Sequence, residues 1–375
     1  MPKLKYDYSA STLDAEKHIA ELNREIRDYC ESQPLETGAD KERFMSRLLR
    51  RAGTAAYRGA TLGEGGPFGA LLVDFHTADN VPQVVGFGTN HVVPNNDPSA
   101  HAEMTAIRNT AERLGRTDLS GLTLITSCEC CPMCLSAATG CKIENVYFAA
   151  TRSEAAKAGF SDEDQYRLMS AGGITQHAQK ATDIKKAEEQ LNGHQAVVIV
   201  NRKGKEHYYY GDYTDAGSKD PTALPIVQAI KKACNGLAET LTQEVGEPQK
   251  VFHLPEDTVL ISRDNPHPLS LVAADWARIG RVRGNNPDNP AEDAQGKNTT
   301  RMLYLNDNVE HMHVRAKDGA VTEVAAERIW EEIKQPRAIH LDKDLGRART
   351  IAFDKWEDMF KNPTGVETPS TVKRY

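Results

Sequence analysis

The sequence predicts an α/β fold in which one structural unit occurs twice. Between residues 68 and 149, short apolar strand patterns alternate with helical patterns. A second series of the same kind runs between residues 196 and 282. Two copies of one α/β unit are the simplest account of this self-similarity.

Two amphipathic helices are expected before the first series. Apolar residues recur at helical spacing through residues 12–31 and again through residues 40–57. A glycine-rich loop at residues 63–66 ends the second of these helices.

A hairpin and a helix come next. Residues 68–75 have the pattern of a buried strand, with residues 84–88 as the hairpin partner across a polar turn. Asp97-Pro98-Ser99 supplies a helix start, and the helix runs to about residue 114. His101 and Glu103 are therefore expected in its first turn.

Three further elements complete the first series. A strand is expected at residues 122–126, a helix at residues 132–139 and another strand at residues 143–149. The N-termini of two predicted helices, the one that runs to about residue 114 and the one at residues 132–139, thus converge on one site. The positive ends of their dipoles favour anions such as thiolate and hydroxide there.

The two helix starts carry a metal-binding pattern. His101-x-Glu103, followed by Cys131-x-x-Cys134, offers one imidazole and two thiolates to Zn²⁺. A closed structural site has four protein ligands, so the fourth position here is open to water. Zinc lowers the pKa of bound water from ~15.7 to roughly 7, and Glu103 is placed to move protons. The pattern therefore predicts an enzyme.

Two more cysteines leave the ligand set open. Cys128 and Cys130 lie just before the predicted pair, and Cys130 stands where zinc nucleobase deaminases, which this motif resembles, have proline. Cys131 and Cys134 are preferred because they keep the Cys-x-x-Cys spacing. The alternative is a four-ligand scaffolding zinc in which Cys128 or Cys130 is the extra thiolate.

The composition is that of an ordinary soluble protein. The chain has 375 residues, enough for two domains, with 39% hydrophobic and 26% charged residues. Its net charge of −7 argues against a broad nucleic-acid surface. No apolar run reaches the ~20 residues of a membrane helix, and residues 1–11 lack the apolar segment of a secretory signal. Four of the seven cysteines lie between Cys128 and Cys134, which fits a reducing compartment, so we expect a cytoplasmic protein with no membrane partner.

Several blocks resemble the cytidine deaminase-like superfamily and, within it, the guanine deaminase family. The resemblance covers residues 44–170 and is carried by Gly65-Gly66-Pro67-Phe68-Gly69-Ala70, Asn90-x-Val92, Asp97 to Glu103, Thr126-Ser127-Cys128-Glu129 and Ala158-Gly159-Phe160-Ser161-Asp162. It implies a three-layer α/β/α fold with a central mixed sheet. It also implies a zinc-dependent hydrolytic deaminase of a planar amino-heterocycle.

The resemblance also implies substrate contacts in the first unit. Asn90 has an amide that can both donate and accept, which suits the edge of a base. Asp162 matches an acidic residue that accepts hydrogen bonds from the substrate, which favours guanine-like purines. Ser161 stands where the family has a further Asp. Phe68 either lines the pocket or packs the first strand.

The second unit lacks the chemistry of the first. Residues 220–231 align with residues 97–108 without a gap, yet Leu224 and Ile226 replace His101 and Glu103. His267 and Ser270 stand opposite Cys131 and Cys134, so no metal site is expected there. We predict a helical extension at residues 1–39, a catalytic domain at residues 40–180 and a catalytically silent deaminase-like domain with a C-terminal tail at residues 181–375.

The silent copy has a possible role in the active site. Guanine deaminase-like proteins form dimers in which one subunit completes the other's pocket, and a tandem chain can do so as an intramolecular pseudo-dimer. Asp275-Trp276-Ala277-Arg278 and the chain's end at Tyr375 resemble family segments that face the substrate. We therefore expect Trp276 and Tyr375 to wall the pocket. A further homodimer stays open.

The predicted function is deamination of a free purine base, guanine to xanthine plus ammonia, or of a related amino-heterocycle. Glu103 is expected to carry protons from water to the ring nitrogen and to the leaving amine. A tRNA adenosine deaminase shares the metal motif but needs a basic surface. A third alternative is a non-catalytic regulatory protein that has retained zinc. It is disfavoured because Glu103 would then have no role.

Overall fold

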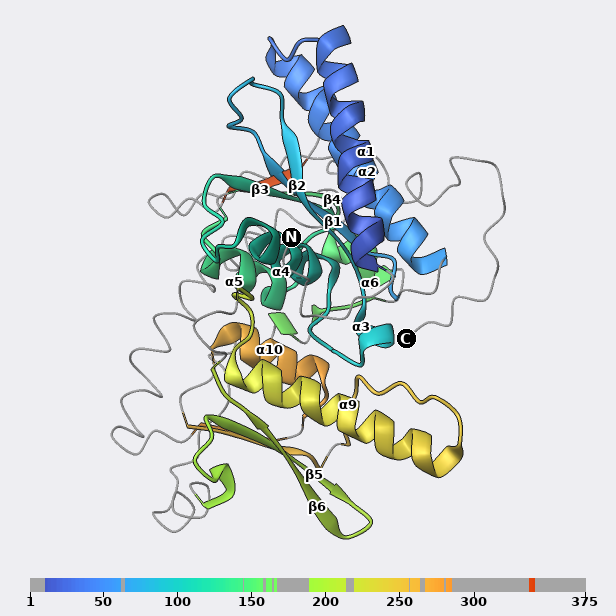
Figure 1. Cartoon of the computed structure of the whole chain (residues 1–375), viewed down its shortest axis with the longest axis vertical. Coiled ribbons are helices and arrows are strands. Elements are labelled where there is room, and N and C mark those ends of the chain that lie inside the picture. The colour runs from blue at the N-terminus through green and yellow to red at the C-terminus, as the bar shows by residue number, and fades with distance from the viewer. Residues whose placement is uncertain are drawn as a thin grey trace, which may run out of the picture.

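Two α/β halves face each other through their helices (Figure 1). The computed structural model describes residues 11–61, 65–143, 145–157, 160–163, 165–166, 189–213, 219–255, 257–263, 267–279, 281–284 and 337–340. Within those ranges, none of the helices combines the length and the apolar character that crossing a bilayer requires.

The first sheet is mixed, as predicted. It comprises β1 (Gly69–Asp74), β2 (Gln83–Thr89), β3 (Leu122–Cys128), β4 (Asn145–Ala150) and β9 (Arg337–His340), in the order β2-β1-β3-β4-β9. β1 runs antiparallel to β2 and β3, whereas β3 and β4 are parallel. β9 was not expected; it pairs antiparallel with β4 and extends the sheet.

Helices cover both faces of this sheet. α1 (Ser11–Ser32) and α2 (Gly38–Thr61) pack on one face, where Leu71, Val73 and Ile125 share a buried cluster with α2 residues. α4 (Ala102–Leu114) and α5 (Pro132–Gly140) lie on the opposite face (Figure 1). Sheet residues alternate between the two clusters because successive side chains of a strand point to opposite faces. The α/β/α fold class is therefore confirmed.

The second sheet repeats the strand order of the first four strands. It comprises β5 (Ala196–Arg202), β6 (Lys205–Gly211), β7 (Val259–Ser262) and β8 (Arg281–Gly284), in the order β6-β5-β7-β8. β5 is antiparallel to β6 and β7, and β7 is parallel to β8. The pairing senses therefore match those of β2, β1, β3 and β4. Duplication of one unit and the predicted domain boundaries remain predictions.

The helices of the second half lie between the two sheets. α9 (Pro225–Val245) and α10 (Pro268–Trp276) face the first half, and α10 packs directly against α5 (Figure 1). One buried hydrophobic cluster runs from Met133 and Leu135 in the first half to Leu269 and Val272 in the second. The two halves thus share a continuous core, and this core lies directly behind the metal-binding pattern.

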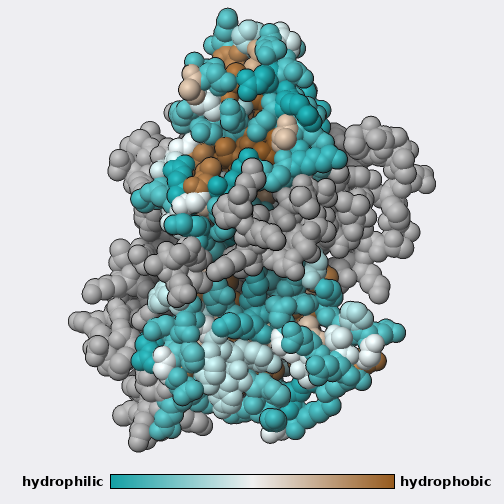
Figure 2. Space-filling model, in the orientation of Figure 1, coloured by the Kyte–Doolittle hydropathy of each residue, from teal (hydrophilic) through white to brown (hydrophobic). Residues whose placement is uncertain are grey.

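Most of the described part of the face shown in Figure 2 is hydrophilic, and hydrophobic residues gather near its upper end, over β2 and α1. Leu22 of α1 and Phe87 of β2 are partly buried and pack against the hydrophobic cluster between the N-terminal helices and the sheet. These apolar contacts explain how the N-terminal extension is attached to the sheet.

Two short helices were not expected. α3 (Val92–Asn95) follows β2, and α6 (Arg152–Lys157) follows β4. Both stand at the ends of strands that lead into the loops around the metal-binding pattern, and both contribute to the wall of the cavity described below.

Candidate active site

Two helix starts bring the predicted metal ligands together. His101 is the N-cap residue of α4, with extended backbone angles (φ −65°, ψ 160°), so it precedes the first turn in which it was expected. Asp97 and Ser99 do not start the helix; they form a turn in which the Ser99 amide donates to Asp97 Oδ1 over 2.9 Å. Cys131 is the N-cap of α5, and Cys134 lies within its first turn.

The three ligand atoms have the spacing of a zinc site. His101 Nδ1 lies 3.5 Å from Cys131 Sγ and 3.6 Å from Cys134 Sγ, and the two sulfurs are 3.4 Å apart. Bond lengths of ~2.3 Å for Zn–S and ~2.0–2.1 Å for Zn–N place tetrahedral ligand atoms roughly 3.5–3.8 Å from one another. The donor set and its geometry therefore fit zinc.

The other two cysteines lie outside this group. Cys128 and Cys130 are buried, but among the described residues only His101, Cys131 and Cys134 form a cluster that could hold a metal ion. Cys128 Sγ instead points to the Thr151 carbonyl oxygen over 3.9 Å. A closed four-ligand site has no support in the described part of the chain.

Glu103 is held beside the ligands. Its side chain is 4% exposed, and Oε1 accepts a hydrogen bond from Thr126 Oγ1 over 2.9 Å. Oε2 lies 3.5 Å from Cys134 Sγ. Burial and the negative charge of Cys131 raise the pKa of the Glu103 carboxyl above its ordinary value. A carboxyl with a raised pKa is a better proton acceptor than an ordinary glutamate, which suits general acid–base work.

The pKa values of the three ligand residues are shifted in different directions. Burial raises the pKa of the Cys131 thiol, but its hydrogen bond with Cys134 and the charge of His101 outweigh this and lower it well below its usual range. Burial and the hydrogen bond with Cys131 raise the pKa of Cys134. Burial opposes protonation of His101, whereas the Cys131 charge raises its pKa. The free site therefore holds protons that metal binding must release.

A cavity of about 190 Å³ opens at this group. Four of the residues predicted to contact the substrate line it, namely Phe68, Asn90, Asp162 and Trp276, together with His101, Glu103 and Cys131. Tyr375 lies outside the described residues. Predicted side chains from both halves of the chain therefore meet at one cavity.

Asn90 has less hydrogen-bonding freedom than the sequence suggests. Its Oδ1 accepts from the backbone amides of Gly66 and Val92, each over 3.2 Å. A Cβ at Gly65, where φ is +143°, would meet the Asn90 carbonyl oxygen at 2.3 Å, so glycine is required there. Because the side-chain oxygen is engaged, Asn90 can offer the cavity only its N–H donors.

Asp162 supplies the complementary group. The carboxyl is 7% exposed and lines the cavity. Burial, followed by the negative charge of Cys131, raises its pKa to about 7, against the opposing charge of Arg152. Asp162 therefore titrates near physiological pH in the metal-free protein.

Trp276 reaches the metal ligands from the second half. Its ring packs edge-on against His101, with centroids 5.1 Å apart and an interplanar angle of 67°. Gln165 Nε2 donates to Asp275 Oδ2 over 2.6 Å and so links the end of α10 to the first half. Phe68, which also lines the cavity, makes a similar edge contact with Phe160, with ring centroids 5.2 Å apart.

Sequence reasoning missed several wall residues. Glu129 and Arg152 line the cavity, and the Arg152 amide donates to Glu129 Oε2 over 3.0 Å. Phe252 and His253 line it from the second half. Glu129 belongs to a block that carries the family resemblance, but Phe252 and His253 have no sequence signal, because their position depends on how the halves pack.

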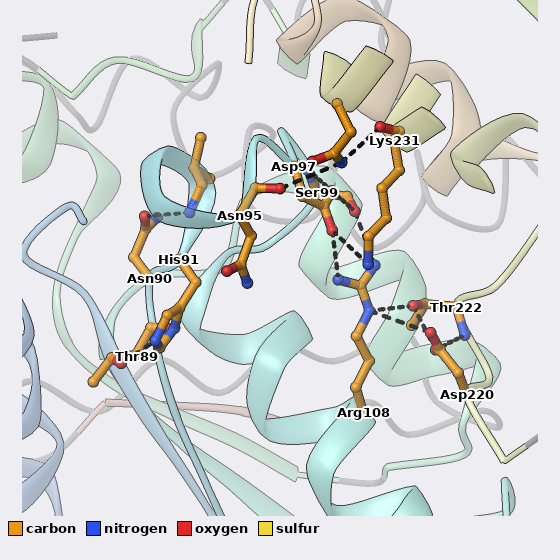
Figure 3. A network of polar contacts seen from close by, with 12 residues as sticks. Thr89, Asn90, His91, Asn95, Asp97, Ser99, Arg108, Asp220, Thr222 and Lys231 are labelled. Atoms are coloured by element: carbon orange, nitrogen blue, oxygen red, sulfur yellow. Dashed lines mark hydrogen bonds and ion pairs between the residues drawn. The ribbon is translucent and has the colours of Figure 1, made fainter. Parts of the chain in front are cut away.

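A buried polar network ties the loop before the metal helix to the second half (Figure 3). Arg108 Nε donates to Thr222 Oγ1 over 2.6 Å and lies 3.6 Å from Asp220 Oδ2. Arg108 Nη1 lies 3.3 Å from Asp97 Oδ2, and Nη2 donates to Ser99 Oγ over 2.8 Å. One guanidinium therefore joins the two halves just ahead of His101.

Known proteins resemble the first part of the chain. The family model for the cytidine and deoxycytidylate deaminase zinc-binding region matches residues 41–150. Guanine deaminase from Bacillus subtilis is 44% identical over 120 residues, which are 32% of this chain and 73% of that protein. A tRNA-specific adenosine deaminase from Haemophilus influenzae is 32% identical over 130 residues, 34% of this chain and 72% of that protein.

Among solved structures, guanine deaminase from Bacillus subtilis shares 34% identity with a TM-score of 0.32, covering 39% of this chain and 92% of that one. Guanine deaminase from Nitrosomonas europaea shares 26% identity with a TM-score of 0.27, covering 34% and 66%. On the strength of the family model and the sequence relatives, the chain belongs to the cytidine and deoxycytidylate deaminase family, whose members are zinc-dependent hydrolases of carbon–nitrogen bonds.

Proposed function

We propose that the protein is a zinc-dependent hydrolytic deaminase of a free purine base or a related amino-heterocycle, with guanine as the favoured substrate. Water and guanine then give xanthine and ammonia. The observation that carries this proposal is the meeting of the three-ligand group, Glu103 and Asp162 at one small cavity.

The polar groups of the cavity favour a purine that displays donors. Ionised Asp162 accepts hydrogen bonds and Asn90 donates them, which matches an amino or ring N–H group beside a carbonyl oxygen. The cavity of about 190 Å³ is smaller than the ~300–1,000 Å³ of pockets that hold drug-sized ligands. A single base is therefore a better fit than a larger ligand.

His101, Cys131 and Cys134 would hold the zinc ion, which supplies an acidic water when bound. Glu103 takes a proton from the attacking water and delivers it to the ring nitrogen next to the reacting carbon. It then takes the second proton of that water from the added hydroxyl and gives it to the leaving amine, which departs as ammonia while the carbonyl forms. Thr126 holds the Glu103 carboxyl at Oε1, so Oε2, which lies beside the metal ligand Cys134, is the oxygen placed to move these protons.

We propose that the second half is a catalytically silent copy that acts as an intramolecular partner. Leu224 and His267, which align with His101 and Cys131, are likewise the N-cap residues of their helices. His267 Nδ1 accepts a hydrogen bond from the Leu269 amide over 3.2 Å, so this histidine serves as a cap.

Reciprocal contacts support this proposal. In the alignment of the two units, Lys231 corresponds to Arg108 and Asp220 to Asp97. Arg108 approaches Asp220 at 3.6 Å, and Lys231 approaches Asp97 at 3.7 Å (Figure 3). An interface in which residue i contacts j and the equivalent j contacts i is typical of a two-fold symmetric dimer.

Trp276 and Tyr375 are proposed as aromatic walls for the planar substrate. Support for Trp276 is its contact with His101 at the cavity. For the tail we expect deletion of residues 371–375 to abolish turnover while the protein stays folded and zinc-loaded; normal activity of the shortened protein would end the proposal for Tyr375.

The cysteines support a reducing compartment, which is our reason for proposing a cytoplasmic location. All seven are free, and four of them lie within Cys128–Cys134.

The function is tested by ammonia release from the zinc-loaded protein. The panel contains guanine, adenine, cytosine, a pterin, a triazine, guanosine and a tRNA. We expect release from guanine or a related free base, at a rate that salt does not change and that falls by at least roughly a hundredfold after Glu103→Gln. Absence of release from every free base would refute the proposal.

A tRNA adenosine deaminase is the second candidate, because such enzymes are among the sequence relatives. The net charge of −7 argues against it, since phosphate contacts need basic residues. Salt-sensitive deamination of tRNA without turnover of free bases would decide in its favour.

A further inference from the structure

A short segment of the second half forms part of the cavity wall. Residues 250–254 lie in the connection between α9 and β7, and Phe252 and His253 within this segment line the cavity together with Trp276. Asn90 and Asp162 line it from the first half. Polar side chains from both halves of the chain therefore line the cavity.

The segment is fastened on both sides. Lys250 Nζ donates to the Pro94 carbonyl oxygen over 2.8 Å, and the Val251 amide donates to Asn96 Oδ1 over 2.9 Å. The Leu254 amide donates to the Ala277 carbonyl oxygen over 2.8 Å. Side chains whose backbone is already fixed lose less freedom when a ligand binds.

Among Phe252, His253 and Trp276, only His253 has a side chain that can both donate and accept a hydrogen bond; the Trp276 indole nitrogen is also without a partner among the described residues, but it can only donate. The His253 ring is half-buried and packs on Phe252, with centroids 4.5 Å apart. Within the described residues its ring nitrogens have no hydrogen-bond partner. Burial and the nearby charge of Arg278 lower the pKa of His253, so the imidazole is neutral at physiological pH. A neutral imidazole offers one donor and one acceptor.

We propose that His253 is a specificity-determining residue that hydrogen-bonds a ring nitrogen of the five-membered ring of a purine-type substrate. The inference rests on the proposed function. Ionised Asp162 supplies an acceptor and Asn90 supplies donors, and in these states neither residue offers both a donor and an acceptor. The five-membered ring of a purine base carries one N–H and one bare nitrogen, which the imidazole can bind in either tautomer.

The test combines variants of His253 with analogues in which carbon replaces one nitrogen of the five-membered ring. Steady-state kinetics of the zinc-loaded protein are measured with guanine, 7-deazaguanine and 9-deazaguanine. We expect the wild type to prefer guanine over one of these analogues by roughly tenfold or more in kcat/KM, the loss that follows when a buried hydrogen bond is removed.

His253→Ala should lower kcat/KM for guanine by a similar factor, mainly through KM, and leave the disfavoured analogue unchanged. His253→Gln, which keeps a donor and an acceptor, should recover part of the preference. His207→Ala is the matched control, because His207 lies on β6 and does not line the cavity. Zinc content and circular dichroism confirm that each variant is folded and loaded.

If His253→Ala lowers kcat/KM equally for guanine and both analogues, His253 only shapes the cavity wall and the inference is wrong. A wild-type protein with the same kcat/KM for guanine as for both analogues would also overturn it. Failure of the proposed function looks different, because the wild type then releases no ammonia from any free base. If another purine is the substrate, the same comparison uses its own 7-deaza and 9-deaza forms.

Discussion

Replacing Arg108 tests whether the second half holds the metal loop in place. The guanidinium is 8% exposed and Asp97 is 1% exposed, so this ion pair is shielded from water. Removing one partner of a buried pair costs about 3–5 kcal/mol, because the remaining charge loses its compensation. Lys231 still stands 3.7 Å from Asp97, so we expect Arg108→Ala to lower the free energy of unfolding by about 3 kcal/mol, the lower end of that range.

The same helix provides a matched control. Arg113 pairs with Glu16 over 3.0 Å, but the two side chains are 37% and 58% exposed. Exposed pairs contribute about 0–1 kcal/mol, so Arg113→Ala should change the free energy of unfolding by less than about 1 kcal/mol. Both variants replace arginine by alanine within α4, so differences in helix propensity cancel.

Urea unfolding of zinc-loaded protein measures the stability change, and competition with a chelator measures zinc affinity. Because Arg108 holds the turn that precedes His101, zinc affinity should fall in Arg108→Ala and stay unchanged in Arg113→Ala. Arg108→Lys keeps the charge but not the fork that reaches Thr222 and Ser99, so we expect an intermediate loss. Equal behaviour of Arg108→Ala and Arg113→Ala would refute the reasoning.

Three other changes have defined outcomes. Glu103→Gln should keep zinc bound and lower kcat by roughly 10²–10⁴-fold, as metal analysis and kinetics would show. The pKa of the Asp162 carboxyl is raised to about 7 in the native protein, so its proton stabilises the folded state at low pH, and this stabilisation is lost as pH rises through 7. In urea titrations between about pH 5 and 7, the free energy of unfolding of the zinc-free wild type should therefore fall by about 2 kcal/mol more than that of Asp162→Asn. Gly88→Ala would place a Cβ 2.4 Å from the Ala102 carbonyl oxygen and 2.4 Å from the Ala106 amide, so it should destabilise the protein by about 1–3 kcal/mol in the same assay.

The sequence was informative wherever local spacing determines structure. His-x-Glu and Cys-x-x-Cys predicted which side chains come together, because both patterns sit at helix starts whose backbone geometry is local. The α/β class followed from the alternation of strand and helix patterns, and the three-layer α/β/α arrangement followed from the family resemblance. Even here local rules had a limit: Asp97-Pro98-Ser99 indicated a helix start, but Arg108 and the turn itself engage those side chains and α4 begins at Ala102.

Contacts between distant segments were harder to predict. Asn90 was expected to donate and accept, yet two backbone amides occupy its oxygen, and no pattern within the Asn90 block indicates this. His253 reaches the cavity only because α10 packs on α5 and the segment before β7 is fastened to the first half. β9 joins the first sheet from far along the chain, a pairing that local propensity does not specify.

A covalent link between the two halves changes what the proposed silent copy can do. In a dimer of separate chains, a wall residue such as Trp276 is lost from the partner's cavity whenever the subunits dissociate. Within one chain its effective concentration is set by the linker and does not fall on dilution. The second copy then needs no metal of its own, so its two helices can begin at Leu224 and at a capping His267 in place of metal ligands. The segment around His253 can instead evolve to recognise the substrate held by the first half.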